Sequence, residues 1–445
     1  MYWIAKTIHR LGRGRRRLLI LLAVVGPGII TMVADNDAGG ISTYAVTGSK
    51  YGFNLLWLFF ILVPMAYCVQ EMTVRLGAVT KRGNAEAIFD GFGPVWGWFS
   101  IFDLAVVNWL TLVTEYIGMI AAMRIFGVPA WITFLAVTAV LMGIVITGRY
   151  WTFEKLTLVF CAFNLVYIPA ALWAMDTPTS PGWGAVAQGF YAPEFPQGLT
   201  GDLIFIIMAN IGTTITPWQI FFQQSAVVDK GMDIRDVQFG KIDTLAGSTL
   251  TGLVAIFIII TTGAAFYYNH LPPIEDAATT AEALAPLLPH GHGDWGRRLF
   301  AIGLFDAGFL GALCISLSTS WAVGEVFGWA HSLNKSVRDA PWFYVIYLGT
   351  LGTAGGVVLW AVDRPDILIL VNMFVQVVAV TLLPAALVFL ILLLNDKDRM
   401  GEYANTRWQN IANWGIILLV IVMSTAYALT ILMPEWFGQG QRGAP

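Results

Sequence analysis

Charged residues are scarce in this chain. Only 12% of its 445 residues are Asp, Glu, Lys or Arg, whereas 57% are hydrophobic. An ordinary soluble domain carries about 25% charged residues. The composition therefore excludes an ordinary soluble protein and predicts one polytopic membrane domain, since no loop is long enough to hold a soluble domain of useful size.

Signatures of enzymes and of cross-linked folds are missing as well. The chain has three cysteines, Cys68, Cys161 and Cys314, each inside an apolar run, which argues against a disulfide framework or a zinc site. It has no Gly-x-x-x-x-Gly-Lys sequence for ATP hydrolysis and no His-Glu-x-x-His sequence for a membrane metalloprotease. Its basic residues form short clusters beside apolar segments, which gives no case for nucleic acid. We expect no enzyme, no cofactor and no obligate protein partner.

Long apolar segments are abundant instead. A helix needs about 20 apolar residues to cross a bilayer. Eleven segments meet this need, and they lie at 18–47, 53–78, 97–126, 130–147, 154–175, 199–229, 245–269, 299–332, 342–362, 366–394 and 410–433. Residues 1–17 and 434–445 are then terminal tails.

Lys and Arg are distributed unequally between the two sides of these segments. They cluster in the tail 1–17 and in the loops after the second, fourth, sixth, eighth and tenth segments, whereas the loop 176–202 has none. Basic loops mark the cytoplasmic side. We therefore expect a multi-pass protein of the cell membrane, in contact with lipid, with the N-terminus inside and the C-terminus outside.

The first segment contains residues that a lipid-spanning helix avoids. Asp35, Asn36 and Asp37 lie near its middle, and Gly39 and Gly40 follow. Ionisable groups at membrane depth are costly and mark functional sites. Because glycine is a poor helix former, the segment is predicted to be interrupted there. Transporters use such interruptions to present backbone carbonyls to an ion.

The sixth segment is predicted to be interrupted too, because Pro217 lies in its middle. Because each half would hold five spans, an odd number, a duplicated half would be inserted upside down. The pattern predicts two inverted repeats of five helices, 18–175 and 199–394, followed by an eleventh helix at 410–433. The other long spans are expected to be continuous scaffold helices.

Both interrupted motifs resemble those of the NRAMP family of divalent-metal transporters. Gly-Pro-Gly at 26–28 and Asp-Ala-Gly-Gly at 37–40 fill the first-helix motifs, and Gly-Thr-Thr-Ile-Thr-Pro-Trp at 212–218 fills the sixth-helix motif. Val375-Gln376-Val377-Val378 with Leu383-Pro384 fits the tenth helix. The resemblance implies an all-α, LeuT-type fold, with helices 1 and 6 interrupted at mid-membrane. By resemblance, Asp37 is the anionic metal ligand.

The departures from the family pattern point to one branch of it. The family's Asn falls on Gly40, its metal-binding Met on Thr216, its His on Trp218 and the first acid of its Asp-x-x-Glu pair on Leu112. The result resembles the NRAMP-related magnesium transporters. The chemistry agrees independently, because thioethers favour transition metals, whereas oxygen ligands and retained water suit Mg²⁺.

The residues expected at the metal site come from both interruptions and from the tenth helix. We expect Asp37 to bind the ion, Thr213 to contribute a carbonyl, Thr216 its hydroxyl and Gln376 a contact through water, while Gly40 shapes the cavity. The role of Asp35 stays open, since it faces the same cavity only if the helix is unwound. Glu115 is expected to be a structural or cavity carboxylate, and the sequence names no partner for Asp103, Asp306 or Glu325.

Together these features predict a transporter that carries Mg²⁺, and also Mn²⁺, by alternating access. Because the family's His and one of its paired acids are replaced, we expect passage uncoupled from protons. One alternative is a proton-coupled Mn²⁺ or Fe²⁺ transporter. Another is a sodium-coupled amino-acid transporter on the same fold, in which Asp37 would repel the substrate carboxylate.

Overall fold

A computed structural model describes residues 26–195, 198–274 and 293–432, and every regular element in these ranges is helical. The expected tails, 1–17 and 434–445, lie outside the described residues, as does the start of the first span. The main helices are α3 (Pro27–Val33), α4 (Ala38–Tyr51), α5 (Phe59–Thr80), α6 (Asn84–Phe92), α7 (Pro94–Ile125), α8 (Ala130–Ile146), α9 (Tyr150–Phe163), α10 (Tyr167–Met175), α11 (Gly182–Tyr191), α12 (Gly201–Thr214), α13 (Pro217–Lys230), α14 (Val237–Thr262), α16 (Gly293–Phe327), α17 (Pro341–Ala361), α18 (Pro365–Asn395), α19 (Lys397–Met400) and α20 (Arg407–Leu432).

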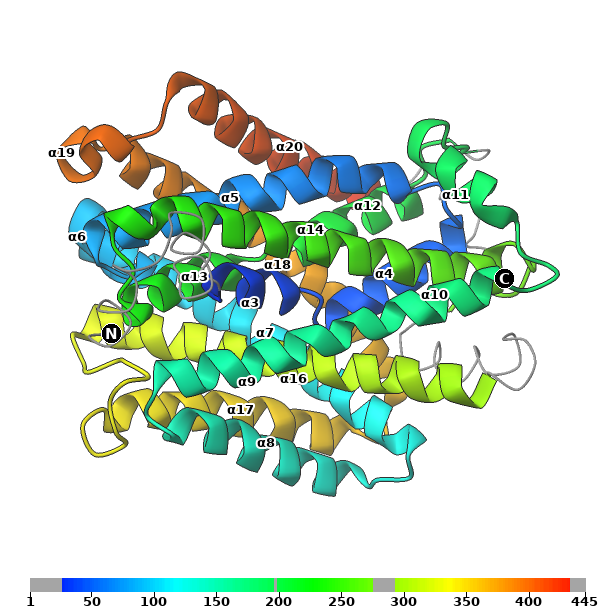
Figure 1. Cartoon of the computed structure of the whole chain (residues 1–445), viewed down its shortest axis with the longest axis horizontal. Coiled ribbons are helices and arrows are strands. Elements are labelled where there is room, and N and C mark those ends of the chain that lie inside the picture. Colours follow the sequence, from blue (N-terminus) through cyan, green and yellow to red (C-terminus); the bar gives the residue numbers. More distant parts are fainter. Residues whose placement is uncertain (1–25, 196–197, 275–292, 433–445) are drawn as a thin grey trace, which may run out of the picture.

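The long helices run side by side along the length of the molecule (Figure 1). In the described ranges, nine helical segments are long and apolar enough to cross a membrane by length and composition. The first expected span is absent from these nine because it forms two short helices, and the fourth, Ala130–Ile146, has only 17 residues. The largest shift from expectation is at the seventh span, which begins at Val237 and not at 245.

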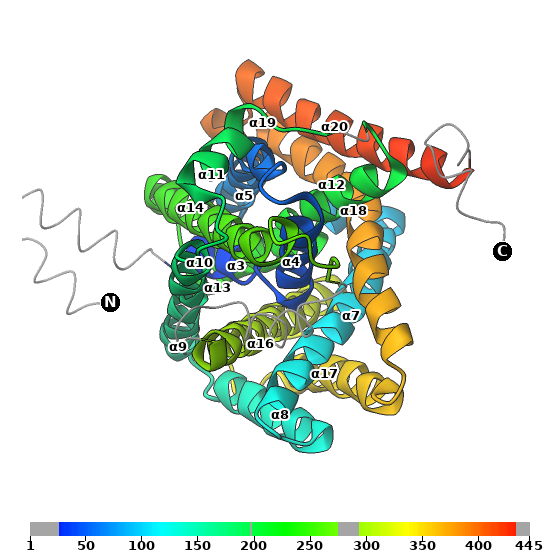
Figure 2. The ribbon, with the colours of Figure 1, turned by 90° about the vertical axis from the view of Figure 1, so that its right-hand side faces the viewer.

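The interrupted helices lie inside the bundle. Seen end on, α3, α4, α12 and α13 are surrounded by the longer helices, while α8, α17 and α20 lie at the periphery (Figure 2). Burial agrees, because 89% of the most apolar part of Gly201–Lys230 is buried, against 22% for Arg407–Thr430. The central position explains why these segments tolerate polar residues that lipid would exclude.

Both predicted interruptions are present, and a third was not predicted. Helix α3 ends before the non-helical segment 34–37, and Ile215 and Thr216 are extended between α12 and α13. The fifth span was expected to be continuous, but a 3₁₀ turn, Asn164–Val166, separates α9 from α10. Helix α14 also ends in a π-helical turn, Gly263–Tyr267.

The start of α3 is held by a carboxylate from another helix. Asp243 of α14 accepts hydrogen bonds from the backbone N–H groups of Gly26, Gly28 and Ile29, at 3.1, 2.7 and 3.3 Å. These N–H groups have no partner within their own helix, because the first turn of a helix leaves its donors free. Asp243 therefore ties α3 to α14.

A buried ion pair lies beside this contact. Lys230, the last residue of α13, donates to the Glu154 carboxylate of α9 at 2.5 Å, and both side chains are almost fully buried. A Cβ atom placed on Gly26 would overlap the Glu154 carboxylate, so the chain entering α3 passes directly over the pair. One end of α3 is thus packed against α9, α13 and α14.

Candidate ion-binding site

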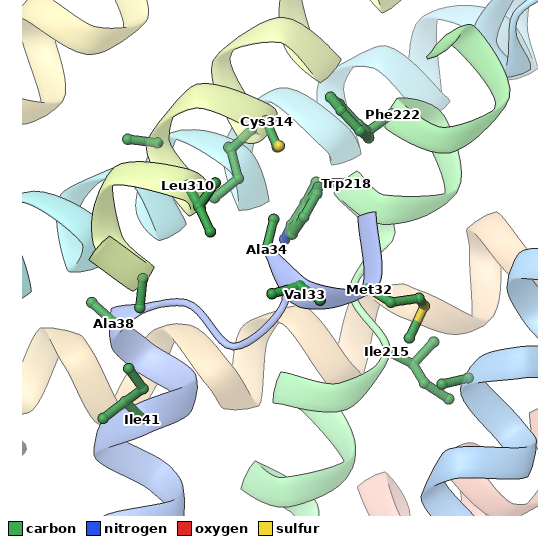
Figure 3. Packing of buried hydrophobic residues seen from close by; sticks show 14 of the residues in the cluster. Met32, Val33, Ala34, Ala38, Ile41, Ile215, Trp218, Phe222, Leu310 and Cys314 are labelled. Carbon is green, nitrogen blue, oxygen red and sulfur yellow. The ribbon is translucent and has the colours of Figure 1, made fainter. Parts of the chain in front are cut away.

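The first interruption is organised by Asp37. This residue is extended (φ −73°, ψ 177°), and its Oδ1 accepts the backbone N–H of Gly40 at 2.6 Å, which caps α4. Its side chain is 1% exposed. Figure 3 shows the non-helical chain between Val33 and Ala38. Asp37 is therefore both a helix cap and a buried carboxylate at the interruption.

The second interruption releases backbone carbonyls. In a continuous helix the carbonyl of Thr213 would accept the N–H of residue 217, but that residue is proline and has none. The carbonyl of Gly212 would accept the N–H of Thr216, which donates instead to Oε1 of Gln219 at 3.0 Å. Figure 3 labels Ile215 in this extended stretch. The geometry frees two carbonyl oxygens of the kind that coordinate cations in interrupted helices.

The two interruptions meet at Gly40. A Cβ atom placed on Gly40 would lie 2.7 Å from Oγ1 of Thr213, 3.1 Å from the carbonyl oxygen of Asp35 and 3.3 Å from Oδ1 of Asp37. The hydroxyl of Thr213 is buried and has no hydrogen-bond partner. A carboxylate, a carbonyl and a free hydroxyl therefore converge at a position kept open by the absence of a side chain.

Glu115 of α7 adds a second carboxylate. Its Oε2 accepts the N–H of Ala38 at 3.0 Å, its carboxyl group faces that of Asp37, and its Oε1 has no hydrogen-bond partner. Helix α16 leaves space for both acids, because a Cβ on Gly311 would lie 2.8 Å from Oε2 of Glu115 and 3.0 Å from Cβ of Asp37. The sequence marked Glu115 as an acid in an apolar helix, but did not place it against Asp37.

The side chain of Asp35 adds an acid to the first interruption. Both of its carboxylate oxygens are buried and neither makes a hydrogen bond. The neighbouring Gln219 uses Oε1 for Thr216, while its Nε2 has no partner. A buried polar atom without a partner is costly. Asp35, Gln219 and the unpartnered hydroxyl of Thr216 therefore form a polar region that water or an ion would stabilise.

The structure brings some of the expected site residues together and leaves others apart. Asp37, Gly40 and Thr213 come together, and Asp35 joins them through its backbone carbonyl. Thr216 lies in the second interruption, and its hydroxyl is buried and free. Gln376 belongs to α18, but its side chain lies outside the described residues. Sequence reasoning missed Gln219, although an amide in the first turn after Pro217 is a recognisable signal.

Known structures share this architecture. A manganese transporter of Eremococcus coleocola superposes with a TM-score of 0.77 at 19% identity, over 98% of this chain and 91% of that one. A Na⁺-coupled sialic acid symporter matches with a TM-score of 0.62 at 11% identity, over 93% and 95%. These likenesses show the fold, which with its two interrupted helices is of the LeuT type.

Sequence comparison is more specific. The chain belongs to the Nramp family, because the family described as natural resistance-associated macrophage protein-like matches residues 28–430. A divalent metal cation transporter of Yersinia pestis, MntH, is 26% identical over 93% of this chain and 96% of its own length. MntH of Klebsiella pneumoniae is 24% identical over 91% and 93%. These relatives are named as transporters and not as enzymes.

Proposed function

We propose that this protein carries divalent metal cations across the cell membrane, with Mg²⁺ as its main substrate and Mn²⁺ as a second one. The observation that carries the proposal is the set of atoms around Gly40. The three atoms nearest to the position of a Cβ there are all oxygens, from Asp35, Asp37 and Thr213. Oxygen ligands suit Mg²⁺ and Mn²⁺, whereas sulfur ligands favour softer metals.

Charge balance supports a divalent ion. Asp37 and Glu115 place two carboxyl groups against each other in a buried region. A dication would neutralise two carboxylates at once, which offsets part of the cost of burying them. Mg²⁺ keeps several of its waters and uses only one or two carboxylates. The ion would therefore sit partly hydrated between the two interruptions, with Thr216 and Gln376 reaching it directly or through water.

We infer an alternating-access cycle in which α3–α10 and α12–α18 act as two inverted repeats around the ion. An inside-negative membrane potential is worth about 2.3 kcal/mol per charge per 100 mV, and about twice that for a dication. Uptake then needs no second ion, so we propose passage uncoupled from protons. The MntH relatives are named for divalent metal cation transport, which supports the substrate class.

The test is metal uptake by proteoliposomes that contain the purified protein. Mg²⁺, Mn²⁺ and Ca²⁺ entry would be followed together with internal pH. We expect Mg²⁺ entry without acidification, and loss of entry in Asp37→Ala. Acidification that accompanies metal entry would favour the proton-coupled alternative, and normal entry in Asp37→Ala would overturn the site.

A further inference from the structure

The interruption of the fifth span creates a second polar cluster inside the bundle. The 3₁₀ turn Asn164–Val166 between α9 and α10 packs against α16, and Figures 1 and 2 show α9 and α10 beside that helix. The cluster consists of Asn164 and Tyr167 at the turn and Asp306 on α16. All three are at least 97% buried.

Each member of this cluster has an oxygen without a partner. Nδ2 of Asn164 donates to Oδ2 of Asp306 at 2.9 Å. That bond leaves Oδ1 of Asn164 and Oδ1 of Asp306 unused, and the hydroxyl of Tyr167 is unused too. Buried polar atoms are almost always paired, so three free oxygens in one place need an explanation.

The hydroxyl of Tyr167 belongs to the same place. A Cβ on Gly303 would lie 2.7 Å from this hydroxyl, and Gly303 precedes Asp306 by three residues, close to one helical turn. The ring packs edge to face against Phe300 of α16, with the ring centres 5.4 Å apart. The ring of Tyr167 therefore packs against α16, and its hydroxyl lies near enough to Asp306 for an electrostatic interaction with the carboxylate.

The cluster is separate from the site at Gly40. Asp306 lies five residues before Gly311, the glycine of α16 that contacts Asp37 and Glu115. Five residues correspond to about 7.5 Å along a helix and about 140° around it. The two groups of oxygens therefore lie on different faces of α16, and each contains its own acid.

In the described ranges, no Lys, Arg or His forms an ion pair with the carboxylate of Asp306. A buried carboxylate without a partner is strongly unfavourable. One cation with a single charge would neutralise it, whereas a dication would leave an excess positive charge in a low-dielectric region. The neutral oxygens of Asn164 and Tyr167 complete the set of ligands.

We propose that Asp306, Asn164 and Tyr167 form a second cation site that binds an alkali monovalent cation, for which Na⁺ is the probe. Carboxylate, amide and hydroxyl oxygens are hard ligands of the kind that hold hard metal cations in proteins. The site is independent of the divalent-metal site, since it shares no residue with it.

The experiment measures binding of ²²Na⁺ to the purified full-length protein, with choline replacing Na⁺ to hold ionic strength constant. We expect one saturable site in the wild type and none in Asp306→Asn. Tyr167→Phe, which removes only the hydroxyl, should bind about tenfold more weakly, the effect of losing one polar contact. Asp103→Asn on α7 is the matched control and should bind as the wild type does, as should Asp37→Ala.

Two results would overturn the proposal. One is the absence of saturable ²²Na⁺ binding to the wild type, which would leave a proton as the occupant of Asp306. The other is unchanged binding in a folded Asp306→Asn or Tyr167→Phe protein, with loss in Asp37→Ala, which would place the Na⁺ at the divalent-metal site. Because Tyr167→Phe is conservative, its result counts even if Asp306→Asn fails to fold.

Discussion

Two glycines determine how closely the oxygens of the candidate site approach one another. Gly40 leaves room for the Thr213 hydroxyl, and Gly311 leaves room for the Glu115 carboxyl beside Asp37. Interiors are close-packed, so one methyl group at either position must displace a neighbour. These residues therefore act through the space that they leave free.

Gly311→Ala is expected to impair transport by displacing Glu115. The added Cβ would lie 2.8 Å from the Glu115 carboxylate, which must move from Asp37. Loss of a group that supports a metal ligand lowers affinity about 10- to 100-fold. Uptake measured against metal concentration checks this, and Gly352→Ala on α17, where nothing lies within 4 Å of the new Cβ, is the control. Equal apparent affinity in both variants would contradict it.

Two substitutions at the site should change the preferred metal. Thr216→Met combined with Gly40→Asn introduces a thioether and an amide, and thioethers favour transition metals. We expect the ratio of Mn²⁺ to Mg²⁺ uptake to rise. Because a Cβ at position 40 approaches Thr213 within 2.7 Å, Gly40→Ala is the control for steric effects and should lower uptake without changing the ratio. An unchanged ratio in the double variant would place selectivity elsewhere.

For single residues, the sequence predicts which positions inside the membrane carry an acid, but not which side chains lie next to each other. Asp37 could be found because a carboxylate at membrane depth is expensive. Its contact with Glu115 could not, because the two belong to helices whose relative rotation depends on packing against α16. For the same reason, the sequence named no partner for Asp306. In the structure, Asn164 donates a hydrogen bond to its carboxylate.

Among the helices, α3 depends on contacts that its own residues do not make. It has only seven residues, and an isolated helix of that length is unstable. Its first turn is held by Asp243 of α14, and the chain entering it lies over Glu154 and Lys230. This end of α3 can therefore move only when those contacts break.

Asp243→Ala should destabilise the protein. It would leave the backbone N–H groups of Gly26, Gly28 and Ile29 without their acceptor. An unsatisfied buried donor costs about 1–3 kcal/mol. Thermal unfolding in detergent should show a lower midpoint than the wild type, while Asp176→Ala at an exposed position should leave it unchanged. Equal midpoints for both variants would mean that the cap contributes nothing.

The Lys230–Glu154 pair should show strong coupling in a double-mutant cycle. Removing one partner of a buried ion pair leaves the other charge uncompensated and costs about 3–5 kcal/mol. We expect Lys230→Met and Glu154→Met to destabilise the protein singly, and the double variant to lose less than the sum. Chemical unfolding measures all three. Additive losses would show that the two residues do not stabilise each other.

Sequence signals for helix interruptions are uneven. The interruption at 215–216 was predictable because Pro217 follows it directly. The interruption at 34–37 was predicted from Gly39 and Gly40, which themselves lie in the first turn of α4. The 3₁₀ turn at Asn164–Val166 has a proline signal as well, because Pro169 has no N–H for the carbonyl of Leu165, four residues earlier, and its ring clashes with that carbonyl. The turn also packs against α16. Sequence reasoning overlooked this proline.

For the whole molecule, the distribution of basic residues predicts how it inserts. We expect the C-terminus outside, because the loop between α18 and α20 carries Lys397, Arg399 and Arg407 and should stay inside. Alkaline phosphatase fused after the last residue should be active in a bacterial host, whereas phosphatase fused at Asp396 should be inactive. Green fluorescent protein at the same two positions should give the opposite pattern. The reverse result would invert the proposed topology.

The two interruptions also determine the sign of the electric field at the centre of the bundle. Helices α3 and α12 end there, at Val33 and Thr214, and each brings the partial negative charge of a helix C-terminus into the buried centre. The opposing partial positive charges lie at the starts of α4 and α13, and Asp37, which caps α4, offsets the first of them. Two helix C-termini and the Asp37 carboxylate together therefore favour a cation at the centre. An anion of the same size as the transported ion would be repelled by the same groups.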